Sequence, residues 1–306
     1  MNPAPTRPPY GMVPPGYRLP AAARVGTVRL QVADLARSLG FYRDLLGLAV
    51  LRTEAGVAVL AAAGSPEPLL ELHERPGAAP VPRRGRLGLY HFAVLLPERA
   101  ALGRLVAHLA EHGARAGASD HLVSEALYLQ DPDNLGIEVY ADRPRSAWRT
   151  QGRELMMETR PLDLAELVRA AGGARWEELP AGTTIGHVHL HVGELERAAA
   201  FYHAALGLDQ VVWSYPGALF LSAGGYHHHL GLNTWAGPDA QPASEDEARL
   251  LEWELVLPSA ADVEAASASL AAAGHSAEHA DGTLLVADPW GTRLRIRSDE
   301  RAGTPA

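Results

Sequence analysis

The sequence predicts an α+β protein of four β-α-β-β-β units, which pair into two curved mixed-sheet half-barrels. Three observations predict this fold. One segment of the chain recurs without a gap, a second kind of unit follows each copy, and in every unit alternating residues give way to a helical apolar stripe. At 306 residues the chain is long enough for two domains, each with its own core.

The first kind of unit contains the recurring segment, which reads VGTVRLQVADLARSLGFYRDLLGL at 25–48 and IGHVHLHVGELERAAAFYHAALGL at 185–208. Each copy opens with the alternation of a half-buried strand. A helix is expected to begin at Asp34 or after Gly193 and to stop at the glycine of the LGL run. The paired aromatic residues of these helices are expected in the core, namely Phe41, Tyr42, Phe201 and Tyr202.

The second kind of unit runs from Leu89 to Tyr140 and from Leu251 to Arg297. Each copy begins with an apolar strand, continues through a helix near 99–112 or 262–273, and ends with a DP turn and its strands. The resulting boundaries are a proline-rich arm at 1–22, units at 23–76, 86–143, 184–236 and 250–298, and a linker at 144–183 that contains a helix at 162–171.

Composition excludes several classes of protein. A net charge of −9 and a pI near 5.9, with arginines scattered along the chain, argue against an electrostatic nucleic-acid binder. No apolar run approaches the roughly 18 residues of a membrane span, and the first 22 residues lack a signal-peptide core, so we expect a cytoplasmic protein without a membrane partner. Because the chain contains no cysteine, any metal site must use nitrogen and oxygen ligands, for which 14 histidines are available.

One stretch, HLVSEALYLQDPDNLGIEVY from His121 to Tyr140, places a single carboxylate in an otherwise apolar strand. Burying Glu138 in such a strand is costly unless a partner compensates its charge. A metal ion is the most economical partner, provided that histidines reach it from other strands.

Two motifs resemble those of a known superfamily. The run H-x-x-S-x-x-x-Y-x-x-D-P-D, formed here from His121 to Asp133, is similar to the signature of the type I extradiol ring-cleaving dioxygenases. The run GGYHHHLGLNTW at 224–235 resembles that of catechol-2,3-dioxygenase-like proteins. Together with the FY…LGL helices, these motifs resemble the vicinal oxygen chelate superfamily, which also includes glyoxalases and bleomycin-resistance proteins.

The resemblance implies that metal ligands come from the first and last strands of each unit. The residues at these positions are Thr27, His91, Glu138, His187, Glu252 and Arg295. An arginine cannot bind a metal ion and a threonine is a poor ligand, so the first and fourth units have no complete site. Strand alternation places His91, Glu138 and His187 on the face away from the helices. Pairing the second unit with the third brings these three residues together, and the first and fourth then form a metal-free domain.

Two histidines and one carboxylate on three strands suit Fe(II) with three adjacent open positions, and Mn(II) can occupy the same ligands. The predicted function is extradiol cleavage of catechol or a substituted catechol with O2. We expect His229 to act as acid and base, unless a one-residue shift of register turns His228 inward instead. Tyr128 is expected to hydrogen-bond a substrate oxygen. The remaining predicted pocket residues are His121, Ser124, His189, Tyr226, Asn233 and Trp235.

Two other readings of the sequence stay open. One is a different metalloenzyme of the superfamily, either a glyoxalase-like isomerase or lyase or a hydroquinone dioxygenase. The other is a metal-free protein that sequesters an aromatic compound. The predicted partners are a small aromatic diol and O2, with no nucleic acid. We also expect a homo-oligomer, for which the proline-rich arm at 2–20 offers a means of clasping a neighbour.

Overall fold

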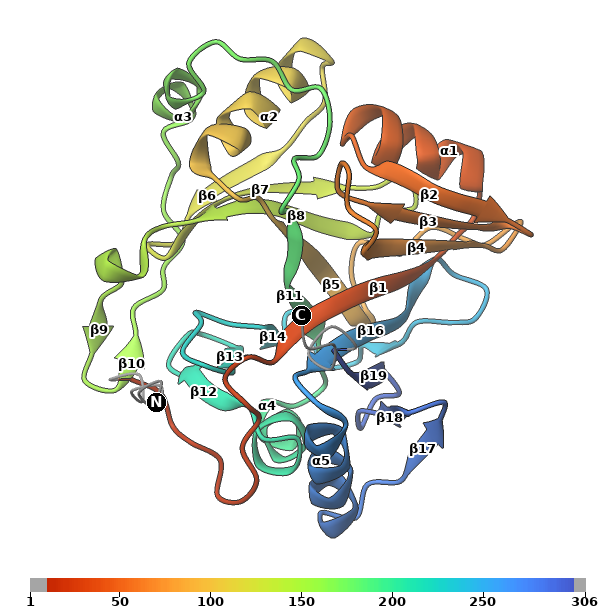
Figure 1. Ribbon diagram of the computed structural model, residues 1–306, viewed down its shortest axis with the longest axis vertical. Helices are drawn as coiled ribbons and strands as arrows, with labels where there is room; N and C mark the ends of the chain where they lie inside the picture. The colour runs from red at the N-terminus through yellow and green to blue at the C-terminus, as the bar shows by residue number, and fades with distance from the viewer. Residues whose placement is uncertain (1–9, 300–306) are drawn as a thin grey trace, which may run out of the picture.

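The computed structural model describes residues 10–299, and their strands form two large mixed sheets (Figure 1). The first sheet has the order β17-β18-β19-β16-β1-β4-β3-β2, and the second β12-β13-β14-β11-β5-β8-β7-β6. The first sheet consists of β1 (Arg24–Val32), β2 (Ala49–Glu54), β3 (Val57–Ala61), β4 (Pro68–Glu74), β16 (Arg249–Leu257), β17 (Ala277–Ala280), β18 (Thr283–Ala287) and β19 (Arg293–Ser298). The second consists of β5 (Arg86–Leu95), β6 (Gly117–Asp120), β7 (Ser124–Gln130), β8 (Gly136–Asp142), β11 (Thr184–His191), β12 (Asp209–Val212), β13 (Ala218–Ser222) and β14 (Leu230–Asn233). The predicted fold class is confirmed.

Both sheets are built in the same way. The first strands of two units pair antiparallel at the centre, β1 with β16 and β5 with β11. Within each unit the first and last strands are parallel neighbours, as β5 and β8 are. The first sheet therefore takes its strands from the first and fourth units, and the second from the middle two. This topology puts the first and last strands of every unit in the middle of a sheet.

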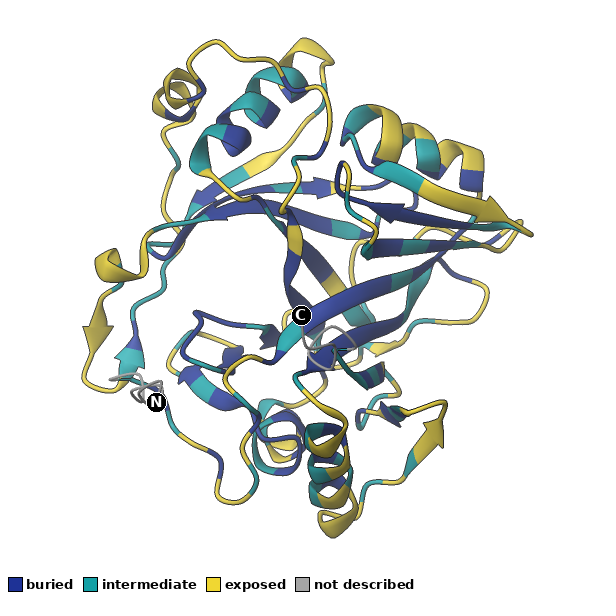
Figure 2. Ribbon diagram, viewed as in Figure 1, coloured by how far each residue is buried: buried dark blue, intermediate teal, exposed yellow. Residues whose placement is uncertain are grey.

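Helices cover the outer faces of the sheets, and a few short elements join them. The helical segments are α1 (Leu35–Leu39) with η1 (Gly40–Leu45), α2 (Arg99–Glu111), η2 (Arg145–Ala147), α3 (Leu164–Ala170), α4 (Leu195–Ala199) with η3 (Ala200–Ala205), and α5 (Ala260–Ala272). A hairpin of β9 (Thr150–Gln151) and β10 (Glu154–Leu155) lies in the linker, and β15 (Gln241–Pro242) pairs with β5. In Figure 2 the strands are mostly buried, whereas the outward faces of the helices are exposed.

The residues predicted to begin and end the first copy of the repeated helix have these roles in the structure. Asp34 caps α1 by accepting a hydrogen bond from the backbone N–H of Arg37. Gly47 ends the helix with φ +80, and a Cβ there would lie 2.8 Å from the backbone of Glu178 and Leu179. Only glycine fits this position, because the linker passes directly over it.

Two tyrosine–aspartate hydrogen bonds tie the sheets to each other. The hydroxyl of Tyr42, from the first unit, donates to Asp131 Oδ2 in the second unit over 3.0 Å. The hydroxyl of Tyr202, from the third unit, donates to Asp288 Oδ2 in the fourth over 3.0 Å. Both tyrosines are fully buried, as expected of core residues. Units that are consecutive in the chain thus contribute to different sheets but remain joined through these bonds.

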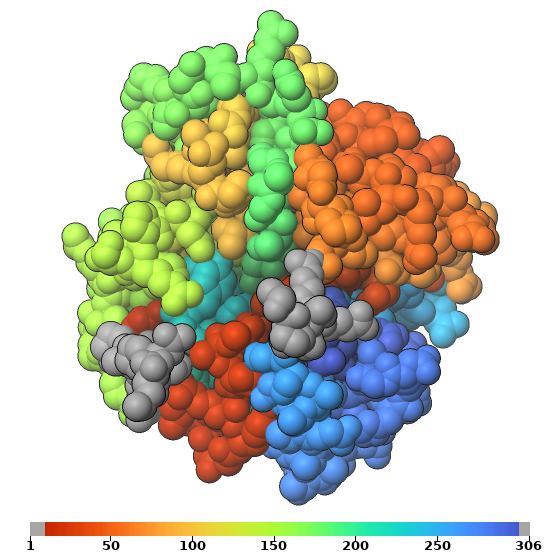
Figure 3. Space-filling model, in the orientation of Figure 1, coloured from red at the N-terminus to blue at the C-terminus, as the bar shows by residue number. Residues whose placement is uncertain are grey.

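The described part of the proline-rich arm packs on its own chain. Met12 forms a β-bridge with Gln210, and the Arg18 guanidinium forms a bidentate ion pair with Asp209 at 2.6 Å. Figure 3 shows this arm, in red, beside the blue fourth unit. Residues 1–9 of the predicted arm lie outside the described residues. None of the helices within residues 10–299 is long and apolar enough to cross a bilayer.

Candidate metal centre

Three buried ligand atoms meet in the centre of the second sheet. His91 Nε2 lies 3.0 Å from Glu138 Oε2 and 3.3 Å from His187 Nε2, and His187 Nε2 lies 3.1 Å from the same carboxylate oxygen. All three side chains are at most 6 % exposed. Within residues 10–299 this is the one group of three His or carboxylate residues whose ligand atoms cluster closely enough to hold a metal ion.

Strand register explains why these three residues converge. Ala93 of β5 pairs with Glu138 of β8 on one side and with His187 of β11 on the other. His91 precedes this alanine by two residues and therefore shares its face. The neighbouring residues Ile137, Val139 and Val188 point the opposite way into the hydrophobic core under the helices. The small side chain of Ala93 leaves space between the carboxylate and the two imidazoles.

The donor set fits a divalent metal ion. Burial lowers the pKa of both His91 and His187, which favours the neutral imidazoles that bind metals. Burial alone would raise the pKa of Glu138, but the two histidines hold it well below its usual range. Three ligands at right angles, each about 2.2 Å from one ion, are separated by about 3.1 Å. The observed separations of 3.0, 3.1 and 3.3 Å match one face of an octahedron.

The equivalent centre of the first sheet holds arginines in place of an ion. Arg29 of β1 bonds Glu71 at 3.0 Å and Glu252 at 2.8 Å, and Arg295 bonds Glu252 at 2.6 Å. Arg297 pairs with Glu254 at 3.0 Å. Guanidinium groups thus neutralise carboxylates that a metal would otherwise have to neutralise.

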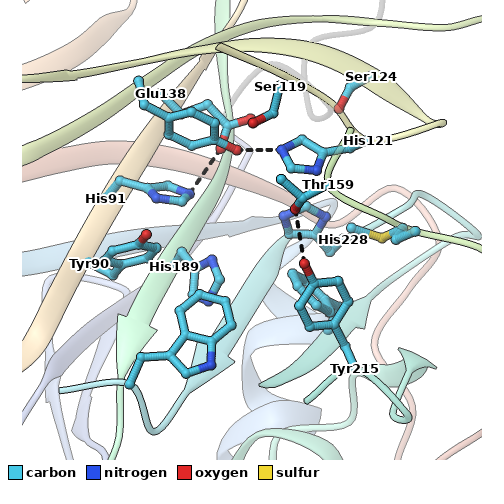
Figure 4. A pocket seen from close by; sticks show the side chains of 14 residues that line it. Tyr90, His91, Ser119, His121, Ser124, Glu138, Thr159, His189, Tyr215 and His228 are labelled. Carbon is cyan, nitrogen blue, oxygen red and sulfur yellow. Dashed lines mark hydrogen bonds and ion pairs between the residues drawn. The ribbon is translucent and has the colours of Figure 1, made fainter. Parts of the chain in front are cut away.

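The metal centre forms one wall of a cavity of about 230 Å³ (Figure 4). The described residues that line it are Tyr90, His91, Ser119, His121, Ser124, Tyr128, Glu138, Met157, Thr159, His189, Tyr215, Phe220, His228 and Trp235. Aromatic rings and imidazoles dominate this set, and none of these residues is an arginine or lysine. The predicted pocket residues His121, Ser124, Tyr128, His189 and Trp235 are all among them. The cavity is suited to a small, uncharged aromatic molecule.

Tyr128 and His121 form an oriented pair on the wall opposite β11. His121 Nδ1 donates to the carbonyl of Glu158 over 2.7 Å. In the neutral ring Nε2 is then the acceptor, so the Tyr128 hydroxyl donates to it over 2.6 Å. Burial, with Glu138 nearby, raises the pKa of Tyr128 well above its usual value. Tyr128 is therefore a protonated phenol whose oxygen can still accept a hydrogen bond from a ligand.

The prediction for His229 requires correction. The structure places His228 at the cavity, with its ring 4.0 Å from that of His187, whereas His229 does not line the cavity. His229 Nδ1 instead accepts the backbone N–H of Ala223 over 3.1 Å. Strand β14 begins only at Leu230, so the alternation used for the prediction does not extend back through the histidine run.

Two further predicted pocket residues lie behind the cavity wall. Tyr226 does not line the cavity, and its hydroxyl bonds the Tyr140 hydroxyl at 2.6 Å. Asn233 is fully buried and orients two imidazoles. Its Nδ2 donates to His189 Nε2 over 2.9 Å, and its Oδ1 lies 2.6 Å from His191 Nδ1. Asn233 thus holds the cavity residue His189 in place without facing a ligand.

Several cavity residues were missed for identifiable reasons. Tyr90 shares the face of His91 because a β-bulge inserts it between Leu89 and His91, which pair with consecutive residues of β11. Met157 and Thr159 come from the linker, where no periodic pattern indicates a site. The other residues that were missed are Ser119, Tyr215, Phe220 and His228. Of these, only His228 had a sequence signal, namely its place in the histidine run.

Comparison with known proteins shows the superfamily to which this chain belongs. The model of the glyoxalase/bleomycin resistance protein/dioxygenase superfamily matches residues 24–139 and 184–296. The chain belongs to this superfamily. The superfamily match spans all three candidate ligands but omits the whole linker at 144–183, so Met157 and Thr159 are contributed by a segment outside it.

Individual members of the superfamily are similar to this chain over most of its length. Catechol-2,3-dioxygenase of Bacillus subtilis (strain 168) is 46 % identical over 268 residues, which is 87 % of this chain and 93 % of the relative. A crystal structure from Bacillus subtilis subsp. subtilis str. 168, of a protein provisionally called a dioxygenase, has a TM-score of 0.64 at 13 % identity and covers 93 % of this chain and 87 % of its own. Glyoxalase I from Zea mays has a TM-score of 0.53 at 18 % identity, with 90 % and 92 % covered. The two solved structures share the fold.

Proposed function

We propose that this protein is an extradiol dioxygenase that cleaves the ring of catechol, or of a substituted catechol, with O2. The observation that carries the proposal is the triangle of His91, Glu138 and His187 ligand atoms at the wall of an aromatic-lined cavity. The 46 % identity to a catechol-2,3-dioxygenase supports it. We further propose that the protein is a cytoplasmic homo-oligomer.

We propose Fe(II) as the bound ion, held by His91, Glu138 and His187, with Mn(II) as the alternative. Two histidines and one carboxylate are the donor set typical of oxygen-activating iron, and they would leave coordination positions for a substrate and O2. The ion would supply Lewis-acid activation of the catechol hydroxyls and a place for O2 next to the ring.

The residues around the ion would bind and orient the diol. The rings of Tyr90, Phe220 and Trp235 supply apolar walls for the aromatic face. Tyr128 is turned by His121 so that its oxygen lone pair is free for a substrate hydroxyl. His228 also lines the cavity, and its imidazole would accept the proton that a catechol hydroxyl must lose. Together these residues would hold one substrate hydroxyl between Tyr128 and His228.

A glyoxalase-like reaction is less consistent with this cavity. The described residues bring one carboxylate to the cluster, and the next imidazole at the cavity is that of His228. A second carboxylate ligand would be expected for an isomerase of that kind. A sequestering protein, in turn, would have no need of three buried ligand atoms with matched spacing.

Anaerobic loading with Fe(II), followed by catechol and then air, tests the proposal. The expected result is the yellow colour of a ring-opened semialdehyde, with one ion bound per chain. The variant His187→Ala should lose both the iron and the colour, because it removes one corner of the triangle. The exposed His112, at the end of α2, provides the matched control His112→Ala, which should keep both. An unchanged spectrum with several diols, or full iron retention by His187→Ala, would refute the proposal.

A further inference from the structure

A second cavity, of about 190 Å³, lies at the junction of the two sheets. Strand β5 of the second sheet and β16 of the first both line it, together with the turn that precedes β19. It shares no described lining residue with the cavity at the metal centre. Most of its wall is apolar, including the side chains of Val81, Leu87, Leu89, Leu135, Leu250 and Trp290.

One guanidinium in the wall of this cavity has no partner. Arg86 also lines the cavity, but it forms a bidentate ion pair with Glu247, with both contacts at 2.8 Å. Arg249 is partly buried, and within residues 10–299 its side chain makes no hydrogen bond or ion pair, although its Nε is fully buried. A buried donor without an acceptor is costly, more so when it is charged. A ligand that accepts from Arg249 would remove this cost.

The chain supplies no carboxylate for this role. The three carboxylates nearest to Arg249 along the chain are each held by other arginines, Glu247 by Arg86, Asp246 by Arg75, and Glu252 by Arg29 and Arg295. The positive charge of Arg249 is thus left over after its neighbours have been paired. An anion from outside the chain would complete the balance.

The wall and the single free charge define the class of anion. A cavity of about 150 Å³ is enough for a benzene ring, so about 190 Å³ has room for a ring and a carboxylate. A planar guanidinium matches the geometry of a carboxylate, which carries one negative charge. A phosphate dianion would bring a second charge into mostly apolar surroundings, where it would have no partner.

We propose that this cavity is a binding site for a small aromatic monocarboxylate. Its ring would pack on Leu87, Leu250 and Trp290, and its carboxylate would accept hydrogen bonds from the Arg249 guanidinium. The site is separate from the metal centre, so the proposal does not depend on the dioxygenase function.

Benzoate is the probe, and isothermal titration calorimetry of the full-length protein measures its binding. We expect one site per chain with a Kd below about 1 mM, which a ligand of this size can reach. Benzamide has the same shape without the charge and should bind at least about tenfold more weakly, because it loses charge-assisted hydrogen bonds. Absence of benzoate binding, or equal affinity for benzamide, would overturn the proposal.

Two substitutions test whether the binding occurs in this cavity. Arg249→Met keeps the apolar stem and should weaken benzoate binding at least about tenfold. It removes no hydrogen bond or ion pair made by the described part of the chain, so its Tm should not fall. Ala243→Leu leaves the charge in place and fills part of the space, so it should weaken binding by a similar factor. If Arg249→Met does not fold, Ala243→Leu decides the test by itself.

Two further variants are controls. Arg169→Met removes an exposed arginine of α3 and should leave the affinity for benzoate within about twofold. His187→Ala disrupts the metal centre and should also bind benzoate as the unaltered chain does. Unchanged affinity in Arg249→Met and Ala243→Leu, or loss of binding in His187→Ala alone, would overturn the proposal. A protein that binds benzoate at this site but cleaves no diol would refute the dioxygenase function and leave the present proposal standing.

Discussion

The buried carboxyl of Asp131 should make the stability of this protein fall as the pH rises through the weakly acid range. Asp131 Oδ1 accepts the backbone N–H groups of Asp133 and Leu135, both over 2.9 Å, and Oδ2 accepts the Tyr42 hydroxyl over 3.0 Å. Burial, only partly opposed by these hydrogen bonds, raises the pKa of Asp131 to about 6. The same turn precedes β8, the strand that contains Glu138, and joins the two sheets.

The size and sign of the effect follow from the pKa shift. The pKa rises from 3.8 to about 6 on folding, so the folded state binds the proton more tightly. Stability from this group is present in full below pH 3.8 and is lost as the pH rises through the folded pKa. A difference of about two units corresponds to about 3 kcal/mol in total, of which about 1 kcal/mol is lost between pH 5 and pH 7.

The variant Asp131→Asn removes this titration while retaining the oxygen that accepts the two N–H groups. Urea unfolding of the metal-free protein at pH 5, 6 and 7 should show the unaltered chain losing about 1 kcal/mol relative to the variant. Titration of all other groups is common to both proteins and cancels in the difference. The exposed Asp239 provides a control, because Asp239→Asn should leave the pH profile unchanged. Parallel curves for the unaltered chain and Asp131→Asn would refute the reasoning.

Two other features yield predictions. In the first sheet, Arg29→Met removes one ion-pair partner from the carboxylates of Glu71 and Glu252. The free energy of unfolding at pH 7, measured with urea, should therefore fall by about 3 kcal/mol. A loss below about 1 kcal/mol would contradict this role. In the cavity, the described lining contains no cationic side chain of arginine or lysine, so a catechol bearing a carboxylate should have kcat/KM at least about 100-fold below that of catechol. Comparable values in a steady-state assay of both substrates would show that the absence of a cation does not select against anions.

The resemblance implied which strands carry the candidate ligands, and strand alternation then placed these residues on one face. His91, Glu138 and His187 each lie in a strand next to residues that face the hydrophobic core, namely Phe92, Ile137, Val139 and Val188. Because the side-chain period of a strand is two, burying those neighbours under helices turns the polar residue to the other face. The internal repeat and the loss of ligands in two units then indicated which units share a sheet.

The alternation of side chains along a strand gave a wrong or incomplete set of cavity residues where the backbone is irregular. The residues before Leu230 form an irregular turn, so counting back from the strand chose His229 although His228 faces the cavity. Tyr90 was missed because a bulge adds one residue to β5 and turns two consecutive side chains toward the same space. Irregularities of this kind depend on the partner strand and leave no periodic signature in the local sequence.

The fold class could be read from the chain because it depends on the internal repeat and on local period, and the clustering of His91, Glu138 and His187 followed once the resemblance had indicated their strands. The closure of the cavity could not, since Met157 and Thr159 arrive from a linker whose path is set by packing far along the chain. The contact between His227 Nε2 and Asp142 Oδ1, at 2.8 Å, likewise joins residues 85 positions apart in the sequence. Such a contact forms only when folding packs the two segments side by side, so neither local sequence predicts it.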